Sequence, residues 1–327
     1  MHLYLLGGHQ KTRWIRPVRA EHRFDLALIV RVDTESACCE RIVEYVTPND
    51  AKPQPESSSL FTSASLCGNK LYACTYSEVL VFEVPFFRRI DYISSPLFNS
   101  VHHVTPTPHG TLLVANTGLD MVMELTTEGS IFREWDVMGG PAWTRFSQNT
   151  DYRKLSTKPH RSHPNFVFQL QEDIWVTRLL QKDAICLTRR VEPIRIDIER
   201  PHDGVLHQGS LYFTTVDGHL VIANAKSRRI DSTADLKAFR EYPFTGPAWC
   251  RGVLVVSRDV VCVGFTRIRK TKLMQAGNWI KHGFREIDPP THIAIFNLAE
   301  KRCLSVVNLE PHGINILFGI LPAESAE

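Results

Sequence analysis

Four histidines stand at matching places in a sequence unit that recurs along the chain: His103, His163, His202 and His312. For His103 and His202, a glycine follows seven residues later. Imidazole nitrogens bind Zn²⁺ and Fe²⁺ and leave coordination positions open for water or substrate. The pattern predicts a divalent metal ion, zinc or iron(II), bound by all four side chains. The alternative is that each histidine is an ordinary polar residue of a turn.

Three charged residues are candidates for catalysis beside such a centre: Asp203, Arg178 and Arg258. Asp203 directly follows His202, where it orients the imidazole, acts as a general base or only caps a turn. Arg178 and Arg258 occupy matching places after similar apolar runs. A guanidinium there can bind a carboxylate or phosphate of a substrate, although a structural salt bridge uses the same group.

Further polar and aromatic residues are expected near the same centre and predict a small, anionic organic substrate. The predicted substrate-binding residues are Asn116, Thr215, Thr245, Trp143, Arg145 and His160. The first three lie at strand ends or unit starts, and the others belong to an insertion. Because successive side chains of a strand point to opposite faces, we expect only one of His102 and His103 to face inward.

The elements that position these residues are short strands in six repeated units. The units begin near Phe61, His103, His163, His202, Thr245 and His312, with steps of 42, 60, 39, 43 and 67 residues. A four-stranded propeller blade takes about 40–50 residues, so the two long steps contain insertions. We place the insertions at 138–160 and 266–290 and expect them to cover the histidines as lids.

The two ends of the chain each supply part of one unit. Residues 26–46 form a hairpin without a unit start, whereas the segment after His312 is a unit start without a hairpin. Pairing of the N-terminal strands with the C-terminal strand would complete a blade and remove exposed sheet edges. The sequence therefore predicts a single all-β domain over 1–327, a six-bladed β-propeller of four-stranded antiparallel blades. Its blades are expected at 61–97, 103–137, 163–198, 202–236, 245–309, and 312–327 joined with 1–46.

One unit resembles a repeat of the NHL type. The resemblance rests on His103 to Val137, with Gly110-Thr-Leu-Leu-Val-Ala-Asn-Thr-Gly-Leu-Asp and Phe132-Arg-Glu-Trp, and on the openings Pro311-His-Gly-Ile and Pro201-His-Asp-Gly. It implies kinship with six-bladed propellers, which include scaffolds and enzymes. Peptidyl-hydroxyglycine lyases hold a catalytic zinc with histidines from different blades, and virginiamycin-type lyases use histidine and a divalent ion. The chain also resembles an uncharacterised family of bacterial six-bladed proteins.

Composition limits the partners and the compartment. The 38 basic and 35 acidic residues nearly balance, and no run of like charge is long enough to follow a phosphate backbone, so nucleic acid is not an expected partner. No apolar stretch approaches the roughly 20 residues of a membrane helix. The N-terminus lacks the features of a signal peptide, and the eight cysteines are scattered, which together predict a cytoplasmic protein.

Two functions from different classes follow. The first is a metal-dependent enzyme, a lyase or hydrolase, in which the ion polarises a substrate oxygen or activates water. If all four imidazoles bind, a non-haem iron oxygenase is a variant of it. The second is a non-catalytic propeller that binds a protein or glycan through the face bearing the insertions.

Overall fold

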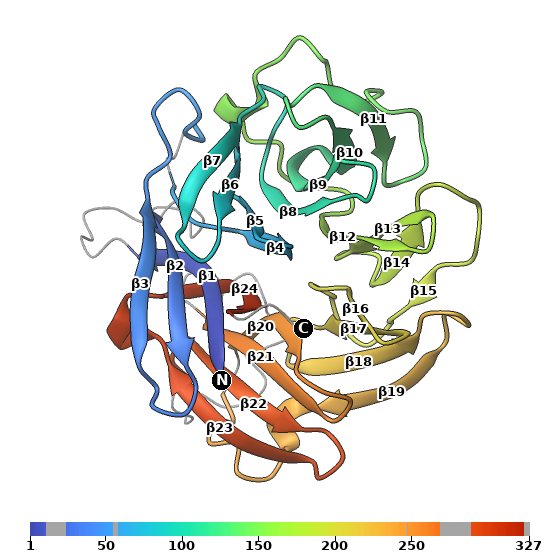
Figure 1. Cartoon of the computed structure of the whole chain (residues 1–327). Helices are drawn as coiled ribbons and strands as arrows, with labels where there is room; N and C mark the ends of the chain where they lie inside the picture. The colour runs from blue at the N-terminus through green and yellow to red at the C-terminus, as the bar shows by residue number, and fades with distance from the viewer. Residues whose placement is uncertain (11–23, 55–57, 247, 269–288, 324–327) are drawn as a thin grey trace.

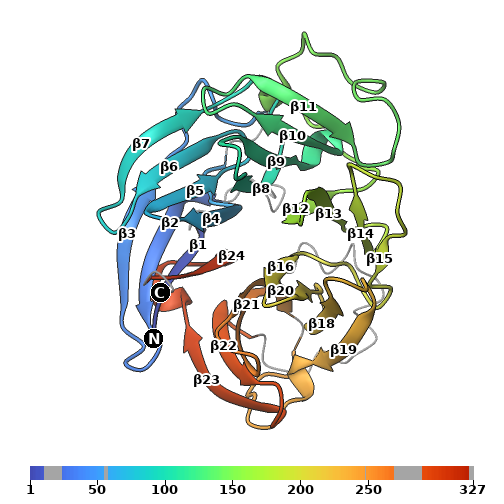
Figure 2. The same ribbon diagram turned by 45° about the vertical axis from the view of Figure 1, so that its right-hand side comes forward.

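The chain folds into six four-stranded antiparallel sheets that surround a central channel (Figures 1 and 2). The computed structural model describes residues 1–10, 24–54, 58–246, 248–268 and 289–323. This architecture confirms the predicted six-bladed β-propeller. None of the described helices is long and apolar enough to cross a membrane.

Each blade is a meander whose first strand lies next to the channel. Blade 1 consists of β4 (Ser63–Cys67), β5 (Lys70–Cys74), β6 (Val79–Glu83) and β7 (Arg88–Ile93). Blade 2 consists of β8 (Val101–Pro106), β9 (Leu112–Asn116), β10 (Met121–Leu125) and β11 (Ile131–Asp136). Blade 3 consists of β12 (Pro164–Leu170), β13 (Asp173–Arg178), β14 (Asp183–Cys186) and β15 (Ile194–Arg195).

The remaining blades follow the same order. Blade 4 consists of β16 (Val205–His207), β17 (Ser210–Thr214), β18 (His219–Asn224) and β19 (Ile230–Asp235). Blade 5 consists of β20 (Ala248–Val255), β21 (Val260–Arg267), β22 (His292–Asn297) and β23 (Arg302–Asn308). Blade 6 consists of β24 (Ile316–Pro322), β1 (His2–Gln10), β2 (Phe24–Asp33) and β3 (Cys39–Tyr45). Short 3-10 helices are η2 (Thr117–Leu119), η3 (Tyr152–Lys154), η4 (Leu236–Ala238) and η5 (Glu310–His312).

Blade 6 closes the ring with strands from both ends of the chain. β24 pairs antiparallel with β1, from Leu3 opposite Pro322 to Gly8 opposite Ile316. The predicted closure is therefore confirmed. Every sheet then packs against two neighbours, which closes the ring of blades.

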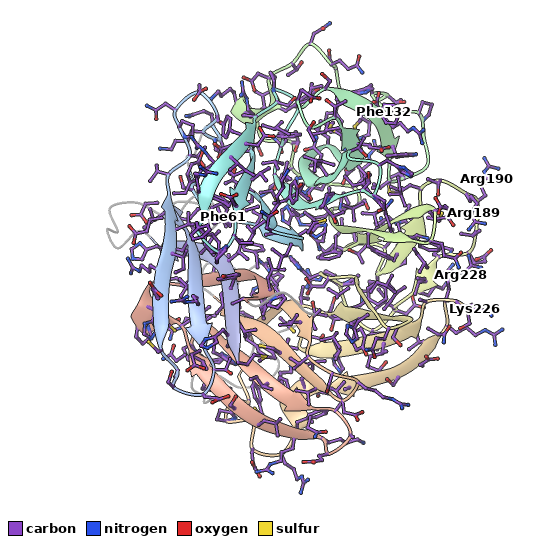
Figure 3. All side chains as sticks on the ribbon, viewed as in Figure 1. Phe61, Phe132, Arg189, Arg190, Lys226 and Arg228 are labelled. Carbon is purple, nitrogen blue, oxygen red and sulfur yellow. The ribbon has the colours of Figure 1, made fainter. Side chains whose placement is uncertain are left out.

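The core lies between neighbouring blades. The middle strands are buried on both faces, as in β9 and β10, and accordingly read as near-continuous apolar runs. The outermost strands are more polar, and β7 is exposed along most of its length. Figure 3 shows this gradient: Phe61 lies in the interior, whereas Phe132 of β11, Arg190 and Lys226 project from the outer rim.

The first predicted insertion packs along the propeller. Within 138–160, Tyr152 of η3 donates a backbone hydrogen bond to Pro96 O. The Lys154 Nζ donates to three carbonyl oxygens between Asn49 and Lys52. These contacts hold the insertion against the linker that precedes blade 1. In the second predicted insertion, 266–290, residues 269–288 lie outside the described residues.

Candidate functional site

Four of the six channel-lining strands carry a β-bulge near their beginning: β8, β12, β20 and β24. A bulge inserts one extra residue, which breaks the alternation of side chains and redirects the residue that it carries. Residues in or beside these bulges include His102, Phe166, Arg251 and Phe318. The irregular strand starts thus place large side chains toward the channel where regular pairing would turn some of them away.

The Phe318 ring lies inside the channel, among side chains of other blades. It contacts residues of three other blades: the His102 and His202 rings, with centroids 6.3 and 5.9 Å away, and Arg251 Cζ, 4.5 Å from its centroid. Because these partners come from blades 2, 4 and 5, Phe318 separates two parts of the channel. We call the part built by His102, His160, His163, His202 and Arg251 the histidine face, and the space on the other side of Phe318 the channel cavity.

Within the histidine face, the His163 ring contacts the rings of both His102 and His160. The rings of His102 and His163 are 4.9 Å apart in an edge-on arrangement. His160 Nδ1 and His163 Nδ1 are 2.8 Å apart, so one donates a hydrogen bond to the other. His102 Nδ1 bonds to Ser100 O at 2.7 Å. Of the predicted residues, the structure therefore brings together His160, His163 and His202.

The expectation that only one of His102 and His103 faces the channel is wrong. His102 contacts Phe318 and the other imidazoles, whereas His103 lines the channel cavity. The physical reason is the bulge in β8, where Val101 and His103 pair with consecutive residues of β9 and His102 is the extra residue. Strict alternation does not hold across such a bulge.

Burial favours the neutral form of three imidazoles of the histidine face, those of His102, His163 and His202. Desolvation lowers the pKa of His102 and His163 well below the ordinary histidine value, and the neighbouring imidazoles add to the shift. Burial also lowers the pKa of His202, although the nearby Asp203 carboxylate opposes it. The pKa of Arg251 falls to about 10 through burial, so its guanidinium stays charged at neutral pH.

Arg251 contacts aromatic rings, and the Asp203 carboxylate acts on it only at longer range, where it partly opposes the effect of burial on the Arg251 pKa. Its Cζ lies 5.0 Å from the Trp249 ring centroid and 4.5 Å from that of Phe318, both within cation–π range. Among the described residues, its side chain makes no hydrogen bond or ion pair, and its Nε is buried. The guanidinium thus retains its hydrogen-bond donors for a molecule that enters the histidine face.

Asp203 connects the two parts of the channel. Its Oδ2 accepts hydrogen bonds from Thr214 Oγ1 and from the backbone N–H of Gly252, which belongs to the β20 bulge that carries Arg251. Its Oδ1 lies 3.5 Å from His202 Nδ1. The carboxylate therefore fixes the bulge and stands beside the imidazole of His202. Its two hydrogen bonds, from Thr214 and Gly252, stabilise the local backbone and leave Oδ1 beside His202.

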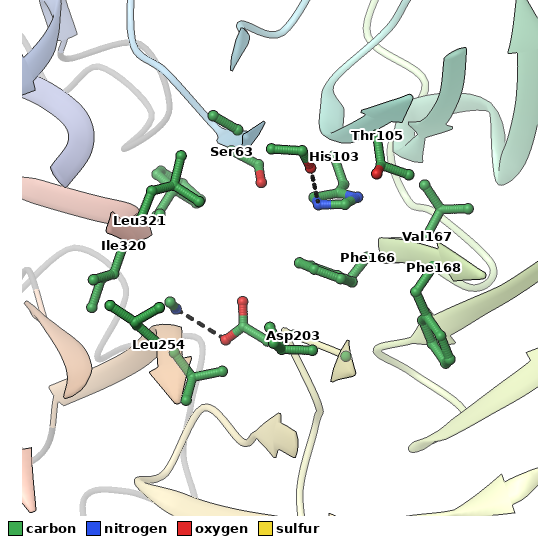
Figure 4. A pocket seen from close by; sticks show the side chains of 18 of the residues that line it. Ser63, His103, Thr105, Phe166, Val167, Phe168, Asp203, Leu254, Ile320 and Leu321 are labelled. Atoms are coloured by element: carbon green, nitrogen blue, oxygen red, sulfur yellow. Dashed lines mark hydrogen bonds between the residues drawn. The ribbon is translucent and has the colours of Figure 1, made fainter. Parts of the chain in front are cut away.

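The channel cavity has a volume of about 380 Å³ and is lined by residues of all six blades (Figure 4). His103 stacks on Phe166 with ring centroids 3.7 Å apart, and its Nε2 lies 3.4 Å from Ser65 Oγ. Burial lowers the pKa of His103 to about 3, which leaves its imidazole neutral. This predicted metal ligand lies on the opposite side of Phe318 from His163 and His202.

The predicted quartet of metal ligands does not form one site. His312 ends η5 at the edge of the ring, where its carbonyl oxygen accepts a hydrogen bond from Arg41 of β3, the outermost strand of blade 6. The segment between η5 and β24 leads from this edge to the channel. His312, at the predicted start of this repeated unit, therefore lies away from the channel. Within the described ranges, no group of three His, Cys, Asp or Glu side chains is placed to hold a metal ion.

The two predicted catalytic arginines lie outside the site. The guanidinium of Arg178 makes two hydrogen bonds to Asp183, of 2.8 and 2.6 Å, and a third to Val137 O. Arg258 is exposed in the turn between β20 and β21. The sequence matched the apolar run before Arg258 to the run before Arg178. The run before Arg178 is β13, the second strand of its blade, whereas the run before Arg258 ends β20, the innermost strand of blade 5.

Three predicted substrate-binding residues also have other roles. The Asn116 amide donates to Leu97 O and its oxygen accepts from Asn99 N, so this fully buried side chain connects blade 2 to the preceding loop. Thr215 Oγ1 donates to Asp217 within a turn. Thr245 is exposed in the loop before β20.

The insertion residues divide between structure and site. Trp143 Nε1 donates to Glu134 of β11, and Arg145 pairs with the buried Asp120 at 2.7 Å. Asp120 also accepts hydrogen bonds from the backbone N–H groups of residues 161–163. Burial raises the pKa of Asp120, but these hydrogen bonds outweigh it and hold the pKa below its usual range. Asp120 therefore positions the segment that presents His160 and His163.

Sequence reasoning missed Arg251 and Phe318 as residues of the site and assigned no role to Asp120. Arg251 precedes Gly252, whose φ of +75° marks the bulge, and an Arg-Gly pair inside an apolar run was the available signal. Phe318 lies in an apolar strand and had no distinguishing signal. Asp120 ends the NHL-like segment, where an acidic residue after Gly-Leu could have indicated a turn anchor.

Comparison with solved structures supports the fold. The chain is similar to a protein of unknown function from Bacteroides caccae, with 10% identity, a TM-score of 0.62 and coverage of 98% of this chain and 97% of that one. It is also similar to a chain in a nidogen/laminin complex, with 11% identity, a TM-score of 0.57 and 97% coverage of both. No protein-family model and no curated protein matches the sequence. The six-bladed fold implied by the NHL resemblance is thus confirmed.

Proposed function

We propose that the chain is an enzyme that binds a small anionic organic molecule at the histidine face, with Arg251 as the anion-binding residue. The observation that supports this proposal is a guanidinium surrounded by neutral imidazoles and aromatic rings, without an acidic side chain in contact among the described residues. A charged group that is buried away from water is stabilised by an oppositely charged partner. A carboxylate or phosphate of a substrate supplies one with matching geometry.

His202 is the proposed general base. Its neutral imidazole has Nδ1 3.5 Å from the Asp203 carboxylate, and its Nε2 has no hydrogen-bond partner within the described part of the chain. With Asp203 as the positioning residue, Nε2 is able to take a proton. A base next to an anion-binding arginine suits a lyase that removes a proton from a carboxylate-bearing substrate, or a hydrolase that activates water.

A metal-dependent form of this enzyme is the second candidate. It is favoured by the 2.8 Å contact of His160 with His163 and by the neutrality of the imidazoles, the form that binds metals. His102, His160 and His163 are the residues that would hold zinc or iron(II), although their described positions do not form a three-ligand group. When bound, such an ion polarises a substrate oxygen or lowers the pKa of water. The chemistry proposed for Arg251 and His202 does not depend on it.

We retain the cytoplasmic location as part of this proposal. All eight cysteines are unpaired thiols, four of them buried, which suits a reducing compartment.

The test is titration of the purified protein with small carboxylates, dicarboxylates and phosphate monoesters by isothermal calorimetry. Arg251→Gln should weaken the tightest of them by at least about tenfold, because a hydrogen-bonded charge pair is lost. Arg200→Gln is the matched control, since Arg200 lies near the same Trp249 ring, at 6.0 Å, but pairs with Glu199 outside the channel. Elemental analysis of a His160→Ala/His163→Ala variant, with His312→Ala as control, tests the metal.

The outcomes separate the candidates. Anion binding lost in Arg251→Gln but kept in His202→Asn, with turnover lost in both, supports the proposal. Zinc or iron that is present at stoichiometric level and lost only from the double histidine variant supports the metal-dependent form. If no anion binds, or if Arg251→Gln binds as the wild type does, the proposal fails. A non-catalytic propeller that binds a protein or glycan then takes its place.

A further inference from the structure

The channel cavity has two chemically different walls. Blades 1 to 4 supply its polar groups together with apolar side chains such as Leu66, Val167 and Leu206, whereas the described lining from blades 5 and 6 has no polar side chain. The polar groups are Ser63, Ser65, His103, Thr105, Gln169 and Asp203. The aliphatic wall consists of Leu254, Ile320 and Leu321, which Figure 4 shows across the opening from His103 and Thr105. Such a lining fits a ligand with one polar end and one apolar side.

Asp203 gives the cavity its charge. It is the one acidic side chain among the described residues of the lining, which include no lysine or arginine, and His103 is neutral. Its Oδ2 is occupied by Thr214 and Gly252, whereas Oδ1 has His202 Nδ1 at 3.5 Å and can still accept a hydrogen bond from a ligand. In Figure 4, this second oxygen points into the open space. The cavity therefore presents one carboxylate oxygen to whatever occupies it.

The depth of the cavity places this oxygen away from solvent. The residues at the closed end are almost fully buried, with Asp203, His103 and Phe318 exposed by 3%, 2% and 4%. Toward the other ends of the strands, the lining becomes accessible, and Leu206 is 43% exposed. A ligand would enter past Leu206 and meet Asp203 at the floor. Charge interactions are stronger at such a floor than at the surface, because the local dielectric is low.

We infer that the channel cavity binds a small protonated amine with an apolar body, whose ammonium group contacts Asp203 Oδ1. An ammonium supplies the missing charge and three donors. Ser63 and Thr105, whose side chains make no hydrogen bond to described residues, are available as further acceptors. The aliphatic wall takes the body, and about 380 Å³ suffices for a compact ring or short chain. This site lies on the other side of Phe318 from the anion proposed at the histidine face, and the two sites share Asp203.

The test uses benzylamine and its neutral counterpart benzyl alcohol, titrated at neutral pH and followed by calorimetry and by NMR of the protein. Benzylamine should bind at least about tenfold more tightly than the alcohol, since only the amine forms a charge-assisted contact. Asp203→Asn should remove this preference. Because Asp203 also bonds to Gly252 and Thr214, the variant can fail to fold, and a second variant is needed.

Thr105→Phe is that second variant. It fills the cavity from β8 without removing a hydrogen bond of the described structure, and it should abolish amine binding with Asp203 intact. Arg251→Gln is the control that separates this inference from the proposed function: it should lose anions and keep benzylamine. Equal binding of amine and alcohol, or benzylamine binding that persists in Thr105→Phe, overturns the inference. Absence of saturable binding also overturns it and leaves the cavity as a water-filled channel.

Discussion

The two parts of the channel use the same six strands in different ways. The histidine face is built where β8, β12, β20 and β24 are bulged, whereas the channel cavity is lined mainly by the regularly paired stretches that follow. At the irregular end, adjacent residues such as His102 and His103 both reach the channel. On the regularly paired β4, Ser63 and Ser65 lie two residues apart and both line the cavity.

The charges also differ between the two parts. The histidine face has a guanidinium among neutral imidazoles, and the cavity has one carboxylate. Asp203 and Gly252 lie at the boundary between the histidine face and the channel cavity. The Gly252 N–H donates a hydrogen bond to Asp203, and the bulge that contains Gly252 directs Arg251 toward the histidine face. A bulge thus lets one strand place side chains in both the histidine face and the channel cavity, because it redirects a side chain without interrupting the blade.

The largest expected effect comes from removing the wall between the two parts. Phe318→Ala should lower the free energy of unfolding by about 3–5 kcal/mol, because a buried aromatic ring is lost and a cavity is left behind. The substitution also removes the cation–π contact of Arg251. Urea denaturation followed by tryptophan fluorescence measures the loss.

Phe318→Leu is the control for this prediction. Leucine keeps most of the apolar volume, so the loss should stay below about 1.5 kcal/mol. If the alanine variant is no less stable than the leucine variant, Phe318 does not act as a packed wall and the division of the channel into two parts is wrong.

Much of the fold could be predicted from the sequence because propeller blades have local signatures. Turns such as Asp217-Gly218 separate apolar runs at regular intervals, and the incomplete units at the two ends indicated the closure. Blade 5 was harder. The apolar run of β20 contains a bulge and no marked turn before Ser257, so its register was displaced by one strand and Arg258 was misplaced.

The site was less predictable for a related reason. His163 and His202 could be found because histidines recur at unit starts, but His312 matched the pattern and lies at the edge of the ring. Arg251 and Phe318 reach the channel through bulges, which depend on pairing between strands and leave little trace in one sequence. The packing of the insertion against the propeller likewise depends on long-range contacts such as that of Arg145 with Asp120.

The second prediction uses pH to distinguish the histidine face from the protein surface. The pKa values of His102, His163 and His202 are lowered by burial, so below about pH 6.5 the unfolded chain binds more protons than the folded one. Stability must then fall as the pH drops, by up to about 1.4 kcal/mol per pH unit for each such histidine. His102→Gln should reduce this slope between about pH 6.5 and 5, as measured by urea denaturation at each pH.

His219 provides a control of opposite sign. Its pKa is raised by the hydrogen bond to Asp217, so its stabilising contribution is present at low pH and is lost as the pH rises through the folded value. His219→Gln should therefore lower the stability by a constant amount below about pH 6.5, without changing the slope there, and should remove the loss of stability that His219 causes as the pH rises above that value. An unchanged slope in His102→Gln would show that the imidazole is already protonated or hydrated in the native protein.

The smallest expected effect tests the boundary itself through two glycines with nearly the same backbone. Gly252 and Gly209 have φ values of +75° and +80°, so alanine brings a similar conformational cost of about 1–2 kcal/mol at both. A Cβ at Gly252 meets Ile320 and the Phe318 carbonyl at 3.3 Å, whereas none of the described atoms lies within 4 Å at Gly209. Gly252→Ala should therefore be less stable than Gly209→Ala by about 1 kcal/mol in thermal unfolding.

Because Gly252 also sets the direction of Arg251, only Gly252→Ala should weaken anion binding. Equal losses of stability, with unchanged binding, would mean that the bulge tolerates a side chain and does not fix the guanidinium.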